Sequence, residues 1–192
     1  MLRDLGFVAD YQCEILPGLP GSGSVPLQFH REGQRTHSEG LVIRVTPNHA
    51  KPWMGNFQYG DEKLSEVYAS PSEETVCVVA QGQGYLVPVN HPAEYEVVRA
   101  YPIKNVFAIP DRRLIVFADF TKLTAYGPKG IAWETQQLSW DGLKITRVTS
   151  EAIQGLAWDS PHQKEVEFLI DTKTGRHQGG SSPETYTGRQ SH

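Results

Sequence analysis

Two aspartates, Asp119 and Asp141, are the side chains of this sequence best suited to do chemistry. Each follows an apolar stretch and adjoins an aromatic residue, Phe120 or Trp140. Burial raises the pKa of a carboxyl group, and paired carboxylates about 5–9 Å apart can hydrolyse a glycosidic bond. A structural role is the more common one, because aspartate at a strand end caps turns. Asp141 also precedes Gly142, as in an Asp-Gly hairpin turn.

Other polar and aromatic side chains could form a binding surface with these aspartates. Lys122 lies three residues after Asp119, where a surface ion pair is the simpler interpretation. Tryptophan stacks on sugars and dominates protein interfaces, but it also fills cores, which is the role expected for Trp133 and Trp158. Catalytic residues are left unassigned. The binding residues predicted from the sequence are Trp53, Asp119, Lys122, Tyr126, Trp140 and Asp141.

No pattern indicates a metal, a cofactor or an activated nucleophile. The seven histidines are scattered, without a His-x-x-x-His or Cys-x-x-Cys pair, and His30, Glu32 and His37 come closest to a ligand set. The glycine-rich loop at 18–24 lacks the Gly-Lys-Ser/Thr of a phosphate-binding loop. No Gly-x-Ser-x-Gly elbow leads from a strand into a helix. We therefore predict neither cofactor nor metal, and expect Cys77 to be a small buried hydrophobe.

Composition narrows the range of partners. The chain has 192 residues, 39% of them hydrophobic and 21% charged, with a net charge of −4. Its lysines and arginines are dispersed, which argues against nucleic acid and anionic membranes as partners. No window reaches the ~18 apolar residues of a membrane span, and no signal-peptide pattern opens the chain. The sequence thus predicts a cytoplasmic globular protein.

Strand and turn signals alternate continuously from Thr75 to Asp171, at the spacing of about 8–12 residues that is typical of an antiparallel meander. Helical crossovers have no room there, which argues against a doubly wound nucleotide-binding fold. A β-branched run, 40–45, precedes this region, and only Asp61–Tyr68 reads as a possible short helix. We predict an irregular segment over 1–40, a β-rich domain over 41–178 and a flexible tail over 179–192.

The stretch from Val106 to Thr135 resembles one blade of a β-propeller. In VFAIPDRRLIVFADF and AYGPKGIAWET, an apolar strand, a tight turn, a second apolar strand, a glycine turn and a tryptophan-bearing strand follow one another. Weaker versions of this layout run from Thr75 to Val98 and from Val148 to Gly175. Three units are fewer than the typical ~4–8 blades of a closed propeller. The resemblance implies an all-β fold with minor α content, an antiparallel meander of blade-like units, partial propeller-like or a β-sandwich.

The segments FADFTKLTAYG and LSWDGLKI also resemble a group of uncharacterised bacterial proteins, which brings no activity with it. Two hypotheses follow. The first, which we favour, is a non-catalytic binding or interaction module, for example a bacterial immunity-type protein. It would bind a protein partner, or a second copy of itself, through exposed sheet edges. The alternative is a small hydrolase acting on a carbohydrate-like ligand, with Asp119 and Asp141 as its carboxylates and Trp140 as a stacking platform.

Overall fold

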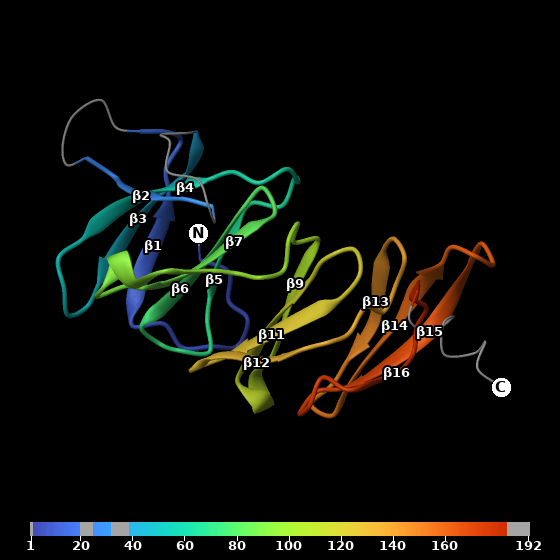
Figure 1. Ribbon diagram of the computed structural model, residues 1–192. Helices are drawn as coiled ribbons and strands as arrows, with labels where there is room; N and C mark the ends of the chain where they lie inside the picture. Colours follow the sequence, from blue (N-terminus) through green and yellow to red (C-terminus); the bar gives the residue numbers. More distant parts are fainter. Residues whose placement is uncertain (1, 20–24, 32–38, 184–192) are drawn as a thin grey trace. The chain divides into compact units, whose positions relative to one another are not determined.

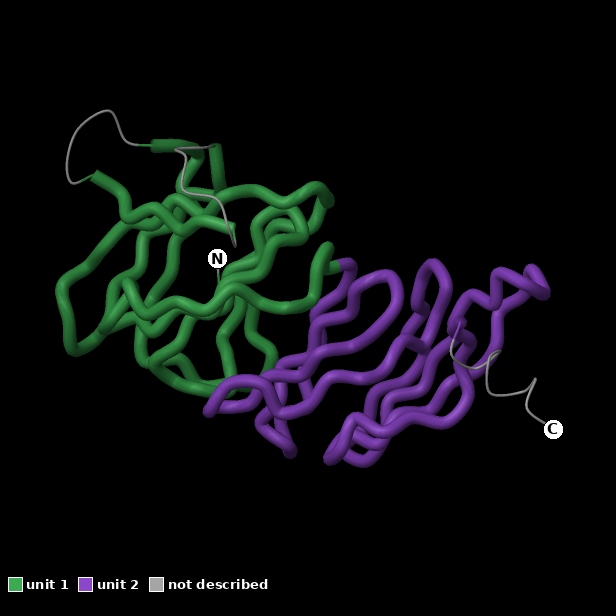
Figure 2. Tube along the Cα trace, viewed as in Figure 1, with its two compact units in different colours: residues 1–103 green, residues 104–192 purple. Residues whose placement is uncertain are grey.

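A computed structural model describes residues 2–19, 25–31 and 39–183 (Figure 1). Nearly all of the regular secondary structure in these residues is β-strand. The chain divides into two compact units at Ile103 (Figure 2). Each unit contains two four-stranded sheets and encloses its own hydrophobic cluster. The β-rich domain expected over 41–178 therefore extends over both units.

The first sheet of unit 1 contains the strands nearest the N-terminus. Its order is β1 (Tyr11–Ile15), β3 (Gly40–Pro47), β4 (Trp53–Gln58) and β2 (Leu27–Phe29). The pairs β1 with β3 and β3 with β4 are antiparallel, whereas β2 runs parallel to β4. Two strands thus lie inside the segment 1–40 for which the sequence predicts irregular structure. A three-residue strand in a parallel pair has no adjoining hairpin turn, so no local signal marks it.

The second sheet of unit 1 is a simple meander. Its strands are β5 (Glu66–Ala69), β6 (Thr75–Ala80), β7 (Gln83–Pro88) and β8 (Glu96–Val97), and the 3-10 turn η1 (Pro92–Glu94) precedes β8. Gln81 and Gly82, both with positive φ, connect β6 to β7, as a two-residue hairpin turn requires. The helix expected over Asp61–Tyr68 is absent. Its second half forms β5, because Val67 and Tyr68 are good strand formers that pair with β6.

The core of unit 1 collects side chains from both of its sheets. Phe29 stacks on Phe57 with ring centroids 4.1 Å apart, and Phe57 meets Tyr85 edge to face at 5.3 Å. The main members of this cluster are Tyr11, Phe29, Ile43, Val45, Phe57, Val67, Val76, Val78, Tyr85 and Val87. Cys77 is fully buried in β6, and burial raises the pKa of its thiol, which makes it unreactive as a nucleophile. Burial likewise raises the pKa of Cys13 to about 12.

Unit 2 contains two further antiparallel meanders. The first has β9 (Asn105–Ile109), β10 (Leu114–Ala118), β11 (Leu123–Gly127) and β12 (Gly130–Glu134), with the 3-10 turn η2 (Pro110–Arg112) between β9 and β10. The second has β13 (Leu143–Val148), β14 (Ala152–Asp159), β15 (Lys164–Asp171) and β16 (His177–Gly179). One face of each sheet contributes to a shared cluster that includes Val116, Leu123, Trp133, Ile153 and Phe168.

The all-β fold class and the blade-like meanders expected from the sequence are confirmed, and every strand expected between Thr75 and Asp171 is present. To these meanders the structure adds two strands that the sequence did not predict, β5 and β16, and each completes a sheet of four. Of the expected flexible tail, Gly179 belongs to β16 and residues 180–183 follow it, whereas 184–192 lie outside the described residues. Within the described residues, no helix is long and apolar enough to cross a membrane.

Candidate functional site

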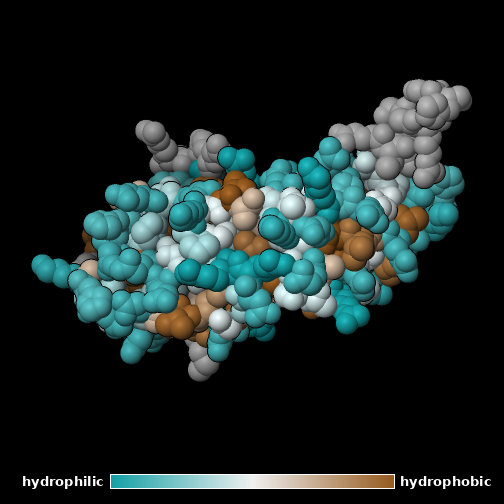
Figure 3. Space-filling view, turned by 90° about the horizontal axis from the view of Figure 1, so that it is seen from below, coloured by the Kyte–Doolittle hydropathy of each residue, from teal (hydrophilic) through white to brown (hydrophobic). Residues whose placement is uncertain are grey.

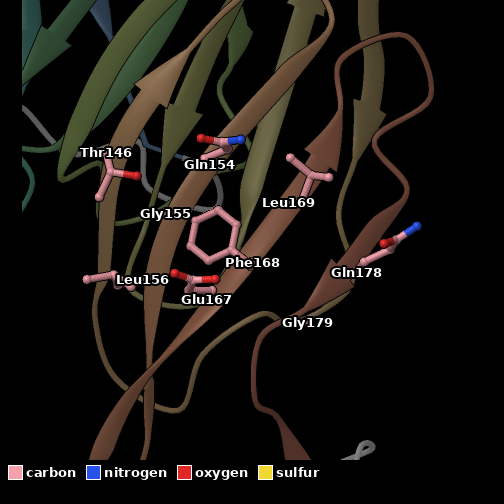
Figure 4. A pocket seen from close by; sticks show the side chains of 9 residues that line it. All are labelled: Thr146, Gln154, Gly155, Leu156, Glu167, Phe168, Leu169, Gln178 and Gly179. Atoms are coloured by element: carbon pink, nitrogen blue, oxygen red, sulfur yellow. The ribbon is translucent and has the colours of Figure 1, made fainter.

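A hollow of about 670 Å³ lies on the β13–β16 sheet, on strands that all come from unit 2 (Figure 4). Four strands contribute to its lining, which consists of Thr146, Gln154, Gly155, Leu156, Glu167, Phe168, Leu169, Gln178 and Gly179. We call this surface the β13–β16 hollow.

The strand register determines which side chains face this hollow. Gln154 pairs with Leu169, and Leu169 pairs with Gln178, so these three residues form a row across β14, β15 and β16. Leu156 and Glu167 pair in the next row on the same face (Figure 4). Side chains alternate along a strand, so the intervening residues point to the opposite face. There Ile153, Ala157, Phe168 and Ile170 join the hydrophobic cluster.

Two glycines are required by the backbone under the hollow. A Cβ at Gly155 would lie 2.3 Å from Cζ of Phe168, so the glycine leaves room for the phenyl ring against β14. Gly179 has a φ of +74°, and a Cβ there would lie 2.3 Å from the carbonyl oxygen of Glu167. Other residues would be strained at such a φ and would collide with β15. β13 adds a bulge between Ile145 and Arg147, at Thr146, and bulges commonly re-aim side chains near binding sites.

The chemistry of the β13–β16 hollow is that of a recognition surface. Leu169 is 39% exposed and is flanked across the strands by two polar residues, Gln154 and Gln178. Gln154 and Gln178 offer amide donors and acceptors beside it, and Glu167 is the one ionisable residue of the lining. A hollow with an apolar centre and amide groups at its rim can bind a partner by packing and hydrogen bonding. It holds no acid–base pair and no nucleophile next to a base.

The sequence-predicted site residues lie elsewhere. Asp119 is buried, with 6% exposure, and its Oδ1 accepts hydrogen bonds from the backbone N–H of Thr121 at 2.7 Å and of Lys122 at 2.9 Å. The hydroxyl of Thr121 donates to the same oxygen. Asp119 thus caps the turn between β10 and β11, which is the structural role considered from the sequence. Lys122 pairs with Glu134, with Nζ and Oε1 2.8 Å apart.

Two of the predicted aromatic residues belong to the interiors of the units. Tyr126 is fully buried in β11, where its ring meets Phe117 edge to face at 5.7 Å. Trp53 packs against the core of unit 1, and its Nε1 donates to the carbonyl oxygen of Val89 at 2.8 Å. Trp133 is buried as expected, and Trp158 is partly buried in β14.

The structure brings the loops of the two predicted carboxylates side by side. The N–H of Gly142 donates to the carbonyl oxygen of Phe120 at 2.8 Å. The side chains have different surroundings, since Asp119 is turned into its own loop whereas Asp141 is exposed. Asp141 precedes Gly142, whose φ of +99° suits the glycine of a turn. Neither aspartate lines the β13–β16 hollow.

A polar cluster that sequence reasoning missed surrounds Asp159 at the end of β14. This carboxylate is buried, its Oδ1 accepts a hydrogen bond from the hydroxyl of Ser181 at 3.0 Å, and its Oδ2 lies 2.9 Å from Nδ1 of His162. Nε1 of Trp140 donates to the same hydroxyl of Ser181 at 3.1 Å. The local sequence Asp-Ser-Pro-His is a turn signal and could have indicated the Asp159–His162 pair. The distant Ser181 could not have been found that way. The cluster fastens the segment after β16 to β14.

No cluster of three or more histidine, cysteine or acidic side chains among the described residues could hold a metal ion. Of the ligand set considered from the sequence, Glu32 and His37 lie outside the described residues. The glycine-rich loop 18–24 is likewise described only in part.

Comparison with known proteins adds little to this geometry. No protein-family model matches the chain, and no curated protein matches it. Among solved structures, a crystal structure of the N-terminal domain of Nup159 can be superposed with a TM-score of 0.43 and 14% sequence identity. The superposition covers 97% of this chain and 56% of that one, so the chain spans about half the length of its structural neighbour. The resemblance of two segments to a bacterial protein group stays a prediction.

Proposed function

We propose that this protein is a non-catalytic interaction module that binds a protein partner at the β13–β16 hollow. The observation that carries the proposal is the exposed Leu169, set between Gln154 and Gln178 on an open sheet face. Protein interfaces commonly have an apolar centre surrounded by a polar rim that forms hydrogen bonds.

The neighbouring edge strand supports a partner that contacts side chains rather than extending the sheet. β13 is the outermost strand of its sheet, and it carries Lys144, Arg147 and the bulge at Thr146. Charged residues and bulges on an edge strand oppose the pairing of another strand with it. Partner binding through exposed sheet edges, as expected from the sequence, is therefore disfavoured at β13, and the sheet face is the better candidate.

The charged residues on the face of the hollow have both signs, because Lys144 pairs with Leu156 and Arg147 pairs with Gln154, in the rows that contain Glu167 and Leu169. The net charge of the chain is −4, and the one ionisable residue lining the hollow is Glu167. Complementary charge accelerates association and selects among partners more than it adds affinity. The neutralisation of a toxin by an immunity-type protein, expected from the sequence, would be one instance of such binding.

The first experiment identifies and measures the partner. A photo-crosslinking amino acid is placed at position 169 in cells of the organism that encodes the protein, and another at position 148 as control. Val148 is 36% exposed, close to the 39% of Leu169, and does not line the hollow. We expect a defined crosslinked protein from position 169 alone. With this partner purified, Leu169→Glu is expected to weaken binding by at least ~10-fold, and Val148→Glu by less than ~2-fold, in calorimetric titration.

Equal crosslinking from both positions, or equal effects of both substitutions, would show that the hollow is not the interface. The claim that the module is non-catalytic is tested separately, by incubating the purified chain with a panel of aryl glycosides and esters. Turnover that is lost in Asp119→Asn or Asp141→Asn would establish the hydrolase alternative instead.

A further inference from the structure

Unit 1 contains a second pocket, of about 530 Å³, between β2 and the turn that connects β7 to β8. Its size falls within the range of small-molecule sites, about 300–1,000 Å³. All of its lining residues are described: Leu27, Gln28, Phe29, Asn90, His91, Pro92, Ala93, Glu94 and Tyr95. It is independent of the β13–β16 hollow, because the two share no residue.

The floor of this pocket is aromatic and held firmly. Phe29 is 2% exposed and stacks on Phe57, while Tyr95 meets it edge to face with ring centroids 5.0 Å apart. The hydroxyl of Tyr95 accepts a hydrogen bond from the backbone N–H of His30 at 3.2 Å. Leu27, which is 42% exposed, adds an apolar side chain at the rim. Such a floor suits a flat or compact apolar group.

The turn that forms the opposite wall is ordered by its own hydrogen bonds. The N–H of His91 donates to the carbonyl oxygen of Pro88 at 3.1 Å, and the N–H of Glu94 donates to that of His91 at 2.9 Å. Both backbone groups of Val89 are hydrogen-bonded. Its N–H donates to the carbonyl oxygen of Glu74, and its carbonyl oxygen accepts a hydrogen bond from Nε1 of Trp53. A wall fixed before binding lowers the entropy lost when a ligand enters.

Asn90 supplies an acceptor that has no donor. Its Nδ2 donates to Oε1 of Glu74 at 3.1 Å. A carboxylate only accepts hydrogen bonds, so this contact fixes which end of the amide is nitrogen. The other end, Oδ1, is buried and has no hydrogen-bond partner among the described residues. A buried acceptor without a donor is unfavourable, and a ligand that brings an N–H group would satisfy it.

The charges around this acceptor select the kind of donor. Glu74 lies behind the amide of Asn90, and Glu94 lies in the pocket lining. Two carboxylates near a carbonyl-type acceptor favour a positively charged donor over a neutral one and repel an anion. His91 is the remaining ionisable residue of the lining.

We propose that this pocket binds an organic ammonium group attached to an apolar body about the size of a phenyl ring, with Asn90 Oδ1 accepting a hydrogen bond from the ammonium and Phe29 contacting the ring. Such a group occurs in free arylalkylamines and at the amino terminus of a peptide that begins with an aromatic residue.

The experiment titrates the full-length, nitrogen-15-labelled protein with four probes and follows backbone amide shifts. Phenethylamine carries the ammonium, methyl 2-phenylethyl ether lacks a donor, phenylacetate reverses the charge, and the tripeptide Phe-Gly-Gly presents the ammonium on a peptide. We expect phenethylamine to shift the amides of Phe29, Ala93 and Tyr95 with a dissociation constant of order 1–10 mM, as small fragments do. The ether and phenylacetate should bind at least ~10-fold more weakly.

Variants connect the shifts to the pocket. Asn90→Leu removes the acceptor together with the hydrogen bond from Nδ2 to Glu74. It is expected to weaken the binding of phenethylamine about 10-fold and to leave the binding of the ether unchanged, since the ether has no donor for this acceptor. Ala93→Trp fills the pocket from an exposed position and should abolish all shifts. Val8→Trp, on a residue that is 68% exposed and outside the lining, is the matched control and should bind as the parent does. Dispersed spectra of each variant establish that it is folded.

The peptide arm distinguishes the two sources of the ligand. Tighter binding of Phe-Gly-Gly than of phenethylamine indicates a peptide amino terminus, and equal or weaker binding indicates a free amine. Equal affinity for the amine and the ether, preference for phenylacetate, or amine binding unaffected by Ala93→Trp would each overturn the proposal.

Discussion

Gly155→Ala is the most direct test of how the β13–β16 hollow is built. Gly155 lies in β14, paired with Ile145 of β13 on one side and Phe168 of β15 on the other. A Cβ at this position would be 2.3 Å from Cζ of Phe168 and 2.5 Å from the carbonyl oxygen of Lys144. Both distances are far inside van der Waals contact, so either the ring or a strand must move.

The expected cost follows from two opposing terms. Forcing a methyl group into a packed core costs about 1–3 kcal/mol. Because the second obstacle is backbone rather than a flexible side chain, we take the upper half of that range. Removing a glycine from a strand returns about 0.5–1 kcal/mol of backbone conformational entropy. The free energy of unfolding of unit 2 should therefore fall by about 1–2.5 kcal/mol.

Urea unfolding followed by tryptophan fluorescence measures this change. Trp133, Trp140 and Trp158 report on unit 2, whereas Trp53 reports on unit 1. In Trp53→Phe the fluorescence therefore follows unit 2 alone, and comparison with the wild type gives the transition of unit 1. Separate transitions must be resolved because two compact units need not unfold as one.

Phe168→Leu, combined with Gly155→Ala, completes a double-mutant cycle. The shorter side chain removes the ring atom that Gly155→Ala would strike, but it leaves the carbonyl oxygen of Lys144 in place. The double variant should be more stable than the sum of the single effects predicts, by about 1 kcal/mol. An unchanged unfolding midpoint in Gly155→Ala, or strict additivity in the cycle, would refute the account of the glycine.

Two further predictions concern side chains outside the hollow. Asp119→Ala should destabilise unit 2 by about 1–2 kcal/mol in urea unfolding, because the N–H groups of Thr121 and Lys122 lose their acceptor; a stability equal to that of the wild type would contradict the capping role. In the folded chain, burial lowers the pKa of His177 below its usual 6.5, so the unfolded chain takes up the proton first as the pH falls. The stability due to His177 should thus be present above pH 6.5 and decline below it, and His177→Gln should remove that part of the slope between pH 8 and pH 5.5; an identical slope in the variant would show that other groups cause it.

The face of the molecule shown in Figure 3 carries small, separate apolar groups rather than one large apolar surface. Hydrophilic residues divide these groups. Large obligate interfaces are more continuously hydrophobic. The two sites proposed above are likewise compact, and each combines an apolar centre with amide groups.

The local sequence was sufficient to predict a strand pair where the two strands are neighbours along the chain. The hairpins of β6 with β7 and of β11 with β12 have glycine turns between them and apolar runs on either side. Asp119 was similarly recognisable as a turn residue, because its hydrogen bonds close within three positions, and the pair Asp141-Gly142 was recognisable because glycine tolerates the positive φ that this turn has. The pattern therefore predicted the meanders and the structural role of both aspartates.

The sequence alone did not predict strand pairs and hydrogen bonds between residues that are far apart along the chain. β2 is three residues long and pairs in parallel with β4, and the paired residues are 28 positions apart in the sequence. Its formation therefore depends on a strand that the local sequence does not indicate. Ser181 meets Asp159 across 22 positions for the same reason. Trp53 and Tyr126 were predicted as binding residues from their residue type, and residue type does not indicate that Tyr126 is fully buried and Trp53 partly buried.

The sequence by itself determined that this chain folds into antiparallel strands and turns, because alternation and turn chemistry act over a few residues. Only the tertiary structure decided which face of each sheet is buried, since Phe168 and Leu169 are adjacent apolar residues and one is 3% and the other 39% exposed. It likewise decided that Asn90, a turn residue by sequence, keeps an acceptor without a donor beside an aromatic floor. Both sites arise from strand register and from contacts between distant segments, which side-chain periodicity within one strand does not encode.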